Sequence, residues 1–285
     1  MVVLALKLFL APACVVAVSL AGRRWGPTVA GLLGGFPVVA GPILLVVTLV
    51  QGRSFGADAA AGSLLGLTAV AASVAVYARA APYLSPPLTL LAAWIAFFAG
   101  VALLGALDVS PLVAFAIAVV SFELSRLLVR VPDELDPADI PMPWWDLPAR
   151  ALSALLLVLA VTIAADALGP TLSGQLAAFP VLTSVLLVFT HLTRGAVEVQ
   201  TLIRAFLLGF YGFAVFSLVL ALALDDLSTA ASFALASVAA MAMQLAMTVR
   251  VRRPFSRRAR RPRPAPPPRA SSRPGATRPA RRELR

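Results

Sequence analysis

The chain has 285 residues, of which 60% are apolar and only 13% are charged. A water-soluble domain of this length does not tolerate such a composition, so these values exclude a soluble globular protein. The formal charge is +11, but thirteen Arg and one Glu lie from Arg252 to Arg285, which leaves the rest of the chain nearly neutral. Single copies of Cys14 and His191 exclude an intramolecular disulfide and a metal cage of several histidines.

Apolar segments long enough to cross a membrane follow one another along the chain. About twenty apolar residues are needed for a helix to cross the roughly 30 Å hydrocarbon layer. We therefore predict an all-α polytopic membrane protein with about nine transmembrane helices. In chain order the segments are Val3–Ala21, Pro27–Val50, Ala57–Ala78, Pro87–Leu107, Pro111–Leu128, Ala149–Leu168, Pro170–Leu192, Val199–Leu224 and Thr229–Val249.

The second and seventh segments contain the same twelve-residue pattern. Residues Gly26 to Pro37 recur as Gly169 to Pro180, 143 positions later, with seven identities. An internal repeat determines the architecture. We predict two four-helix membrane repeats, residues 1–107 and 149–251. Residues 108–148 join the two repeats. They contain a linking helix from Pro111 to Leu128 and an acidic loop rich in Pro and Trp.

The charges of the connections predict the orientation. Lys and Arg are in excess in cytoplasmic loops. Nine spans with a cytoplasmic C-terminus place the N-terminus outside, which puts Arg23 and Arg79 inside and Asp108 and Asp225 outside, with Arg53 as the exception. Five spans separate equivalent points of the two copies, so the second repeat is inverted. We expect a multi-pass protein of the cell inner membrane.

The tail, residues 252–285, is predicted to be disordered, because its Arg, Pro, Ala and Ser cannot form a core. We favour binding to the bilayer and to anionic lipid headgroups, since each Arg near such a surface contributes ~1 kcal/mol. Nucleic-acid binding is the weaker interpretation, because the tail has no element that reads bases. No nucleic-acid partner is expected.

The repeated motif combines glycine with a proline in mid-span. Proline removes a backbone donor and clashes with the preceding turn, so Pro37 and Pro180 predict broken or re-entrant helices. Paired breaks in inverted halves indicate a midplane substrate site in secondary transporters. Close packing through small residues is the alternative for each single glycine. The predicted substrate pathway consists of Thr28, Gly31, Gly34, Phe36, Pro37, Thr171, Gly174, Gln175, Phe179 and Pro180.

Glu123 is the one acid well inside a predicted span. A carboxylate at such depth often serves in a proton relay, so Glu123 with Arg126 is a candidate for proton coupling. The alternative is a local ion pair, because Arg126 lies three residues further on the same helix face. Gln244 in the last segment is expected to form a hydrogen bond between helices.

The repeated motif resembles the small four-span bacterial membrane proteins of the GlpM-like family. The similarity rests on Gly31 and Gly174, on Phe-Pro at positions 36–37 and 179–180, and on Arg194-Gly195. The first copy has Gln51-Gly52 in place of Arg-Gly. The resemblance implies membrane architecture and an association with glycerol-related genes and exopolysaccharide production.

We therefore expect a transporter or flippase-like permease with a midplane site at the two broken helices. The alternative is a non-transporting membrane partner that supports envelope or exopolysaccharide assembly. No catalytic arrangement, cofactor motif or metal-ligand spacing is present in the sequence, so we do not expect an enzyme. The substrate, a small molecule or a lipid, and the formation of homo-oligomers are left open.

Overall fold

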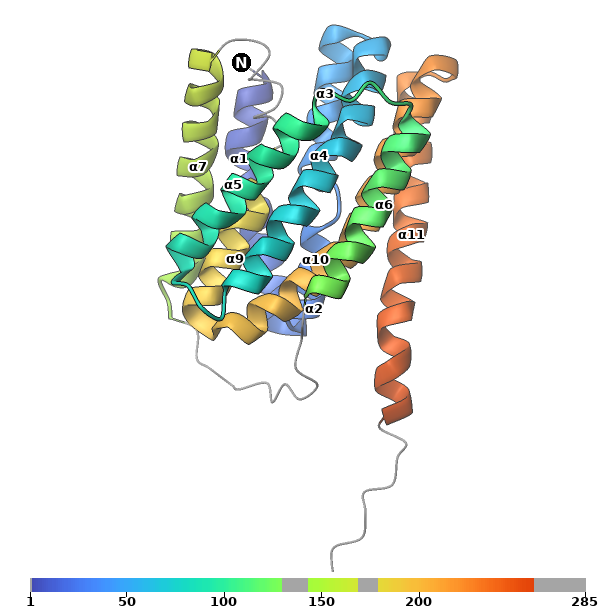
Figure 1. The fold of residues 1–285 in the computed structure, drawn as a ribbon. Coiled ribbons are helices and arrows are strands. Elements are labelled where there is room, and N and C mark those ends of the chain that lie inside the picture. Colours follow the sequence, from blue (N-terminus) through green and yellow to red (C-terminus); the bar gives the residue numbers. More distant parts are fainter. Residues whose placement is uncertain (1, 130–142, 169–178, 259–285) are drawn as a thin grey trace, which may run out of the picture. The chain divides into compact units, whose positions relative to one another are not determined.

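The computed structural model describes residues 2–129, 143–168 and 179–258. Within these ranges the chain forms ten α-helices and no β-strand, as the all-α prediction requires (Figure 1). The chain divides into a compact unit of residues Met1–Val249 and a second unit of residues Arg250–Arg285.

Five helices are long and apolar enough to cross a membrane. They are α4 (Arg53–Ala80), α5 (Pro86–Leu104), α6 (Pro111–Leu128), α10 (Ala196–Asp226) and α11 (Thr229–Arg258), the last as far as Val249. The chain is therefore an integral membrane protein. The predicted number of nine spans stays a prediction.

The other described helices are α1 (Val2–Trp25), α2 (Pro27–Gly34), α3 (Ala40–Gln51), α7 (Asp146–Leu168) and α9 (Val181–Arg194). The second predicted segment thus consists of two helices separated at Gly35–Val39, where the sequence predicted a break. Helix α11 continues to Arg258, past the predicted start of the tail at Arg252, and residues 259–285 lie outside the described residues.

Helix boundaries recur at the spacing of the sequence repeat. Helices α4 and α10 begin at Arg53 and Ala196, and α5 and α11 begin at Pro86 and Thr229. Each pair of positions is separated by the same interval as the two copies of the twelve-residue pattern. The ends of α1 and α7 and the ends of α3 and α9 have this separation too.

One glycine forms the corner before each of the helices α4 and α10. Gly52 has φ +97° and Gly195 has φ +83°, a conformation that residues with a Cβ rarely adopt. Glycine therefore allows one helix to end and the next to begin with a single residue between them. Because these two glycines are equivalent positions of the two copies, the repeat extends to backbone conformation.

Equivalent helices run in opposite directions where they meet. Nη1 of Arg53, at the start of α4, donates to the Leu227 carbonyl just after α10, at 2.9 Å. At the other end, Nε2 of Gln200 in α10 donates to the Ala78 carbonyl of α4, at 3.0 Å. The helices α4 and α10 are therefore antiparallel, and they are the most buried of the five apolar helices. The pair forms the centre of the fold.

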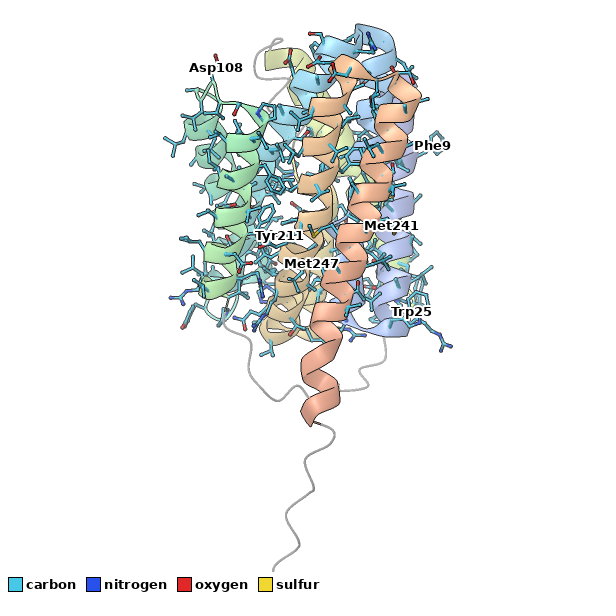
Figure 2. All side chains as sticks on the ribbon, turned by 90° about the vertical axis from the view of Figure 1, so that its right-hand side faces the viewer. Phe9, Trp25, Asp108, Tyr211, Met241 and Met247 are labelled. Carbon is cyan, nitrogen blue, oxygen red and sulfur yellow. The ribbon has the colours of Figure 1, made fainter. Side chains whose placement is uncertain are left out.

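Large side chains fill the core around α4 and α10. Tyr77, Phe97, Phe122 and Phe206 are wholly buried and come from α4, α5, α6 and α10. The linking helix α6 packs against both α4 and α10. Apolar side chains such as Phe9 and Met241 are exposed on the outer surface, as expected of helices that face lipid (Figure 2).

Charged side chains divide between the two ends of the first unit, which Figure 2 marks with Asp108 at one end and Trp25 at the other. We call the end at Trp25 the basic end and the end at Asp108 the acidic end. The arginines at the basic end are Arg23, Arg24, Arg79, Arg126, Arg150, Arg194 and Arg204. The charged residues at the acidic end are Asp58, Asp108, Asp166, Asp225 and Asp226, together with the two bases Lys7 and Arg53.

Candidate functional site

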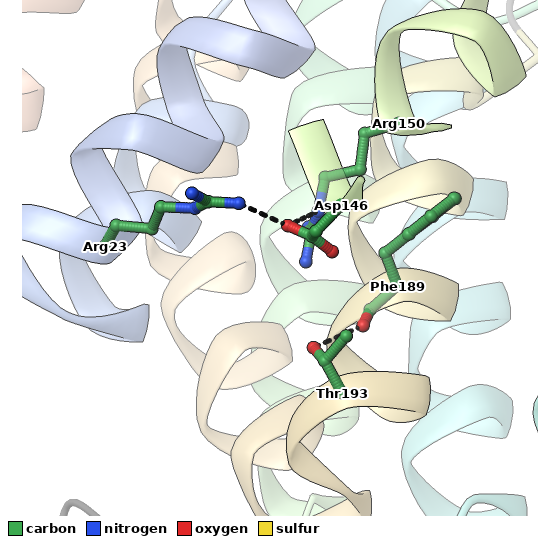
Figure 3. Close-up of polar contacts among 5 residues, drawn as sticks. All are labelled: Arg23, Asp146, Arg150, Phe189 and Thr193. Atoms are coloured by element: carbon green, nitrogen blue, oxygen red, sulfur yellow. Dashed lines mark hydrogen bonds and ion pairs between the residues drawn. The ribbon is translucent and has the colours of Figure 1, made fainter. Parts of the chain in front are cut away.

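A buried carboxylate at the basic end joins the two halves of the chain. Asp146, in the first turn of α7, is wholly buried, and its Oδ2 lies 2.8 Å from Nη2 of Arg23 and 2.9 Å from Nε of Arg150 (Figure 3). Arg23 belongs to the last turn of α1 and lies 123 positions before Asp146. The ion pair therefore connects two helices that are far apart in the sequence. An acid in the first turn and a base in the last turn also complement the two helix dipoles.

Arg150 is almost as buried as Asp146, with 3% of its side chain exposed. Its guanidinium lies 5.3 Å from the centre of the Phe189 ring of α9, where a cation–π interaction stabilises a desolvated charge. Thr193 donates to the Phe189 carbonyl at 2.7 Å and satisfies a carbonyl near the end of α9 (Figure 3). Helices α1, α7 and α9 therefore meet at one charged contact.

A second ion pair lies next to the first. Nη1 of Arg194, the last residue of α9, is 3.3 Å from Oε1 of Glu198 in the first turn of α10. The positive φ of Gly195 places these two side chains on the same side of the corner between the helices. We refer to Arg23, Asp146, Arg150, Arg194 and Glu198 as the charge cluster.

A cavity of about 40 Å³ lies within the charge cluster and is lined by α1, α2, α7, α9 and α10. Five buried polar atoms there have no hydrogen-bond partner among the described residues: Ser19 Oγ, Arg23 Nε, Asp146 Oδ1, Arg194 Nε and Glu198 Oε2. A cavity of about 10–15 Å³ is enough for one water molecule, which needs two to four polar partners. The cavity therefore fits one small polar molecule between donors and acceptors from both halves.

The helix break lies at residues Gly35–Val39, between α2 and α3. Pro37 has no N–H, so the α-helical bond to a carbonyl one turn earlier cannot form there. Nε2 of Gln244 in α11 donates to the Leu32 carbonyl at 2.7 Å, a bond from the last apolar helix to the broken one. The predicted interhelical hydrogen bond of Gln244 is thereby confirmed.

Glycines of the break pack closely against α10. A Cβ on Gly31 would lie 2.6 Å from the Leu202 carbonyl oxygen, and one on Gly35 would lie 2.8 Å from the Gly209 Cα. Gly34 faces the Phe206 ring in the same way. In the part of the chain that is described, these glycines serve the close approach of two helices.

The remaining residues of the predicted substrate pathway have different positions. Thr28 is half-buried in α2, and Phe36 packs in an apolar cluster that includes Phe216 of α10 and Ala240 of α11. Pro37 is buried at the break. Thr171, Gly174 and Gln175 lie outside the described residues. A substrate pathway through this motif stays a prediction.

Phe179, a described residue of the second motif, is covered by α5 of the first half. The Phe179 ring lies 5.2 Å from the ring of Trp94 and 5.7 Å from that of Phe97, both edge-on. Nε1 of Trp94 donates to Ser184 Oγ at 3.0 Å, and Pro180 directly precedes α9. Aromatic contacts and one hydrogen bond thus hold the start of α9.

Glu123 forms the local ion pair that was one of its two predicted roles. Nη1 of Arg126 lies 2.9 Å from both carboxylate oxygens, and the hydroxyl of Tyr211 in α10 donates to the same carboxylate. About half of the Glu123 side chain is exposed. The carboxylate therefore links α6 to α10, while its role in proton coupling stays a prediction.

The charge cluster is the part of the site that sequence reasoning missed. Its arginines lie close to the ends of predicted spans, and nothing in the sequence pairs Arg23 with Asp146. The one local signal is the spacing of four residues between Arg194 and Glu198, and between Asp146 and Arg150. Among the described residues no group of three His, Cys, Asp or Glu side chains could hold a metal ion.

Comparison with known proteins finds no matching family model, no matching curated protein and no matching solved structure. The function is therefore inferred from the residues of this chain.

Proposed function

We propose that the chain is a transporter or flippase-like permease of the bacterial inner membrane, built from two inverted repeats joined by the linking helix α6. Three observations support the repeats. Helix boundaries recur at the interval of the sequence repeat, the equivalent helices α4 and α10 are antiparallel, and the break in the first half falls at the repeated Phe-Pro. Inverted repeats with broken helices are typical of secondary transporters.

The basic end faces the cytoplasm in this proposal. Arginine predominates over acid there, whereas the acidic end has Arg53 as its one arginine among the described residues. Positive charge is retained on the cytoplasmic side of membrane proteins. The N-terminus is then outside, and α11 leads to a cytoplasmic C-terminus.

The observation that carries the proposal is the ion pair between Arg23 and Asp146. It joins α1 of the first repeat to α7 of the second, around a cavity that both repeats line, at one end of the bundle. We assign this contact as the cytoplasmic gate. When the halves separate, Asp146 keeps Arg150 on its own helix, so its buried charge is not left unpaired.

The breaks supply the flexibility that such a movement needs. Residues Gly35–Val39 lack the continuous bonding of a helix, and a few residues at helix ends absorb the backbone rotation in domain closure. The glycine contact between α2 and α10 is flat because neither side has a Cβ at Gly35 or Gly209.

Cysteine accessibility tests the gate. In a Cys14→Ala background, Ser19→Cys reports on the cavity at the basic end and Thr48→Cys, buried in α3, reports on the acidic end. A membrane-impermeant maleimide is applied from either side of oriented vesicles. We expect Arg23→Gln to increase labelling of Ser19→Cys several-fold and to decrease labelling of Thr48→Cys.

Arg24→Gln is the matched control, because Arg24 is exposed and has no hydrogen bond or ion pair among the described residues. It should leave both labelling rates unchanged. A gate requires the two reporters to change in opposite directions. Equal rates in Arg23→Gln and Arg24→Gln, or a parallel increase at both ends, would contradict the transporter.

Proton coupling at Glu123 is a separate part of the proposal. Its carboxylate bridges α6 and α10, so a change in its charge alters a contact between helices. Proteoliposomes with an entrapped pH-sensitive dye should acidify under an imposed membrane potential. We expect Glu123→Gln to abolish this flux and Asp108→Asn, outside the helices, to preserve it. Flux equal to that of empty liposomes would refute the coupling.

A non-transporting partner in envelope or exopolysaccharide assembly is the second candidate. It is favoured by the close packing of Gly31 and Gly35 against α10, which in the described residues leaves no open space at the first break. The resemblance to the GlpM-like family agrees with either candidate. The partner hypothesis predicts that deletion of residues 259–285 abolishes function in cells, while Arg23→Gln changes neither labelling rate.

A further inference from the structure

A long groove lies on the outer surface between α4 and the linking helix α6. Its volume is about 950 Å³, and it is lined along α6 from Val113 to Leu128 and along α4 from Ala72 to Ala80. Small side chains on both helices, Ala72 and Ala75 on one and Ala116 on the other, keep its floor open. The groove therefore exists because these positions of the two helices carry alanine.

Over most of its length the groove has no polar group that needs a hydrogen bond from its occupant. Its lining is almost wholly apolar. The two hydroxyls in it are already satisfied, because Ser121 Oγ donates to the Ala118 carbonyl at 2.8 Å and Ser125 Oγ donates to the Ala71 carbonyl at 3.1 Å. A hydrocarbon chain fits this lining, whereas an extended polypeptide would leave backbone groups without partners.

Arg79 is the one charged residue of the lining, and it lies at the basic end. Four other arginines at that end, Arg23, Arg126, Arg150 and Arg194, form ion pairs. Arg79 is exposed and forms no hydrogen bond or ion pair with the protein among the described residues. Its guanidinium is therefore free to bind an anion at the mouth of an apolar groove.

We propose that this groove binds one anionic glycerophospholipid, with its phosphate on Arg79 and an acyl chain along α4 and α6. The helix from Val113 to Leu128 extends about 22 Å at 1.5 Å per residue. One leaflet of the hydrocarbon layer is about 15 Å thick, so the groove accommodates a chain through the whole depth of its leaflet. The site requires only that the helices lie in a bilayer, and it does not depend on transport.

Native mass spectrometry of the protein released from nanodiscs tests the site. The nanodiscs contain equal amounts of phosphatidylglycerol and phosphatidylcholine with identical acyl chains. We expect one phosphatidylglycerol to remain bound to the wild type. Because an Arg near an anionic headgroup contributes ~1 kcal/mol, Arg79→Gln should reduce the retained phosphatidylglycerol about fivefold.

Two further variants keep the test independent of folding. Arg204→Gln is the matched control, because Arg204 is also exposed and unpaired among the described residues, but lies on α10 away from the groove. It should retain the lipid. Ala116→Phe fills the groove and should release phosphatidylglycerol while Arg79 is intact.

Three results would overturn the proposal. They are equal retention in Arg79→Gln and Arg204→Gln, equal retention of the two lipids by the wild type, and a dimer that cross-links through Ala116→Cys. The last result would show that a second copy of the chain covers the groove.

Discussion

The crossing of α2 and α10 makes a quantitative prediction at Gly35. A Cβ there would lie 2.7 Å from the Phe206 carbonyl oxygen and 2.8 Å from the Gly209 Cα. Non-bonded carbon atoms prefer a separation of about 3.5–4.0 Å, so Gly35→Ala forces the helices apart by about 1 Å. Overpacking of this kind destabilises by about 1–3 kcal/mol. We expect this loss in the free energy of unfolding of the detergent-solubilised protein.

Gly62→Ala is the matched control for this substitution. Gly62 lies inside α4, is exposed, and a Cβ on it would meet nothing within 4 Å. Alanine is favoured over glycine in a helix by about 0.5–1 kcal/mol, so Gly62→Ala should be neutral or stabilising. Thermal unfolding midpoints of the two variants can be compared in one detergent. Equal midpoints would refute the close crossing.

The reciprocal substitution sharpens the same prediction. A Cβ on Gly209 would lie 2.7 Å from the Leu32 carbonyl oxygen and 2.9 Å from the Gly35 Cα. Gly209→Ala should therefore lower the free energy of unfolding by a similar amount. Because one separation of the helices relieves both clashes, the double variant should lose less than the sum of the single losses. Strict additivity would show that the two glycines do not share a contact.

The remaining predictions concern polar contacts. Asp146→Asn leaves two arginines without their buried carboxylate and should cost about 3–5 kcal/mol of unfolding free energy, whereas the exposed control Asp58→Asn should cost nothing measurable. Gln244→Leu removes the 2.7 Å bond at the helix break and should destabilise by about 0.6–1.7 kcal/mol. Trp94→Phe keeps the aromatic contact but loses the hydrogen bond to Ser184, so it should lower the free energy of unfolding within the same range. Equal unfolding midpoints in a variant and the wild type would count against the contact concerned.

The interruption of the second segment could be predicted because its cause is local. A proline in mid-span removes a backbone donor, but Pro12 lies inside the continuous helix α1, so the break near Pro37 follows from Pro37 together with the neighbouring Gly34 and Gly35. The recurrence of helix boundaries could also be predicted, since the repeat places equivalent residues at equivalent positions. The corner at Gly195 does not belong with these features, because a glycine in the sequence permits a positive φ without requiring one.

The roles of the glycines could not be decided from the sequence. A midplane cavity and a close helix crossing both favour a missing side chain, so Gly31 and Gly34 fit either. Which one occurs depends on what lies opposite, and the partners Leu202 and Phe206 belong to the other half of the chain. The burial of Asp146 could not be predicted either, because its partner Arg23 is 123 positions away in the sequence.

The two breaks are covered reciprocally. Phe36 of the first break packs against the apolar cluster that includes Ala240 of α11, and Phe179 of the second motif packs against Phe97 of α5. Ala240 and Phe97 are equivalent positions of the two copies, so each half covers the break of the other with the same helix. A movement of one half relative to the other must therefore change the surroundings of both breaks at once.

The contacts at the two breaks differ in strength. The first break has a small Ala240 and one hydrogen bond from Gln244, while the second has three aromatic neighbours and the bond from Trp94. Aromatic pairs contribute about 0.5–1.5 kcal/mol beyond the area they bury. We therefore expect amide hydrogen exchange at Val38 and Val39 to be faster than at Val181 and Leu182. The reverse order would contradict this ranking of the two contacts.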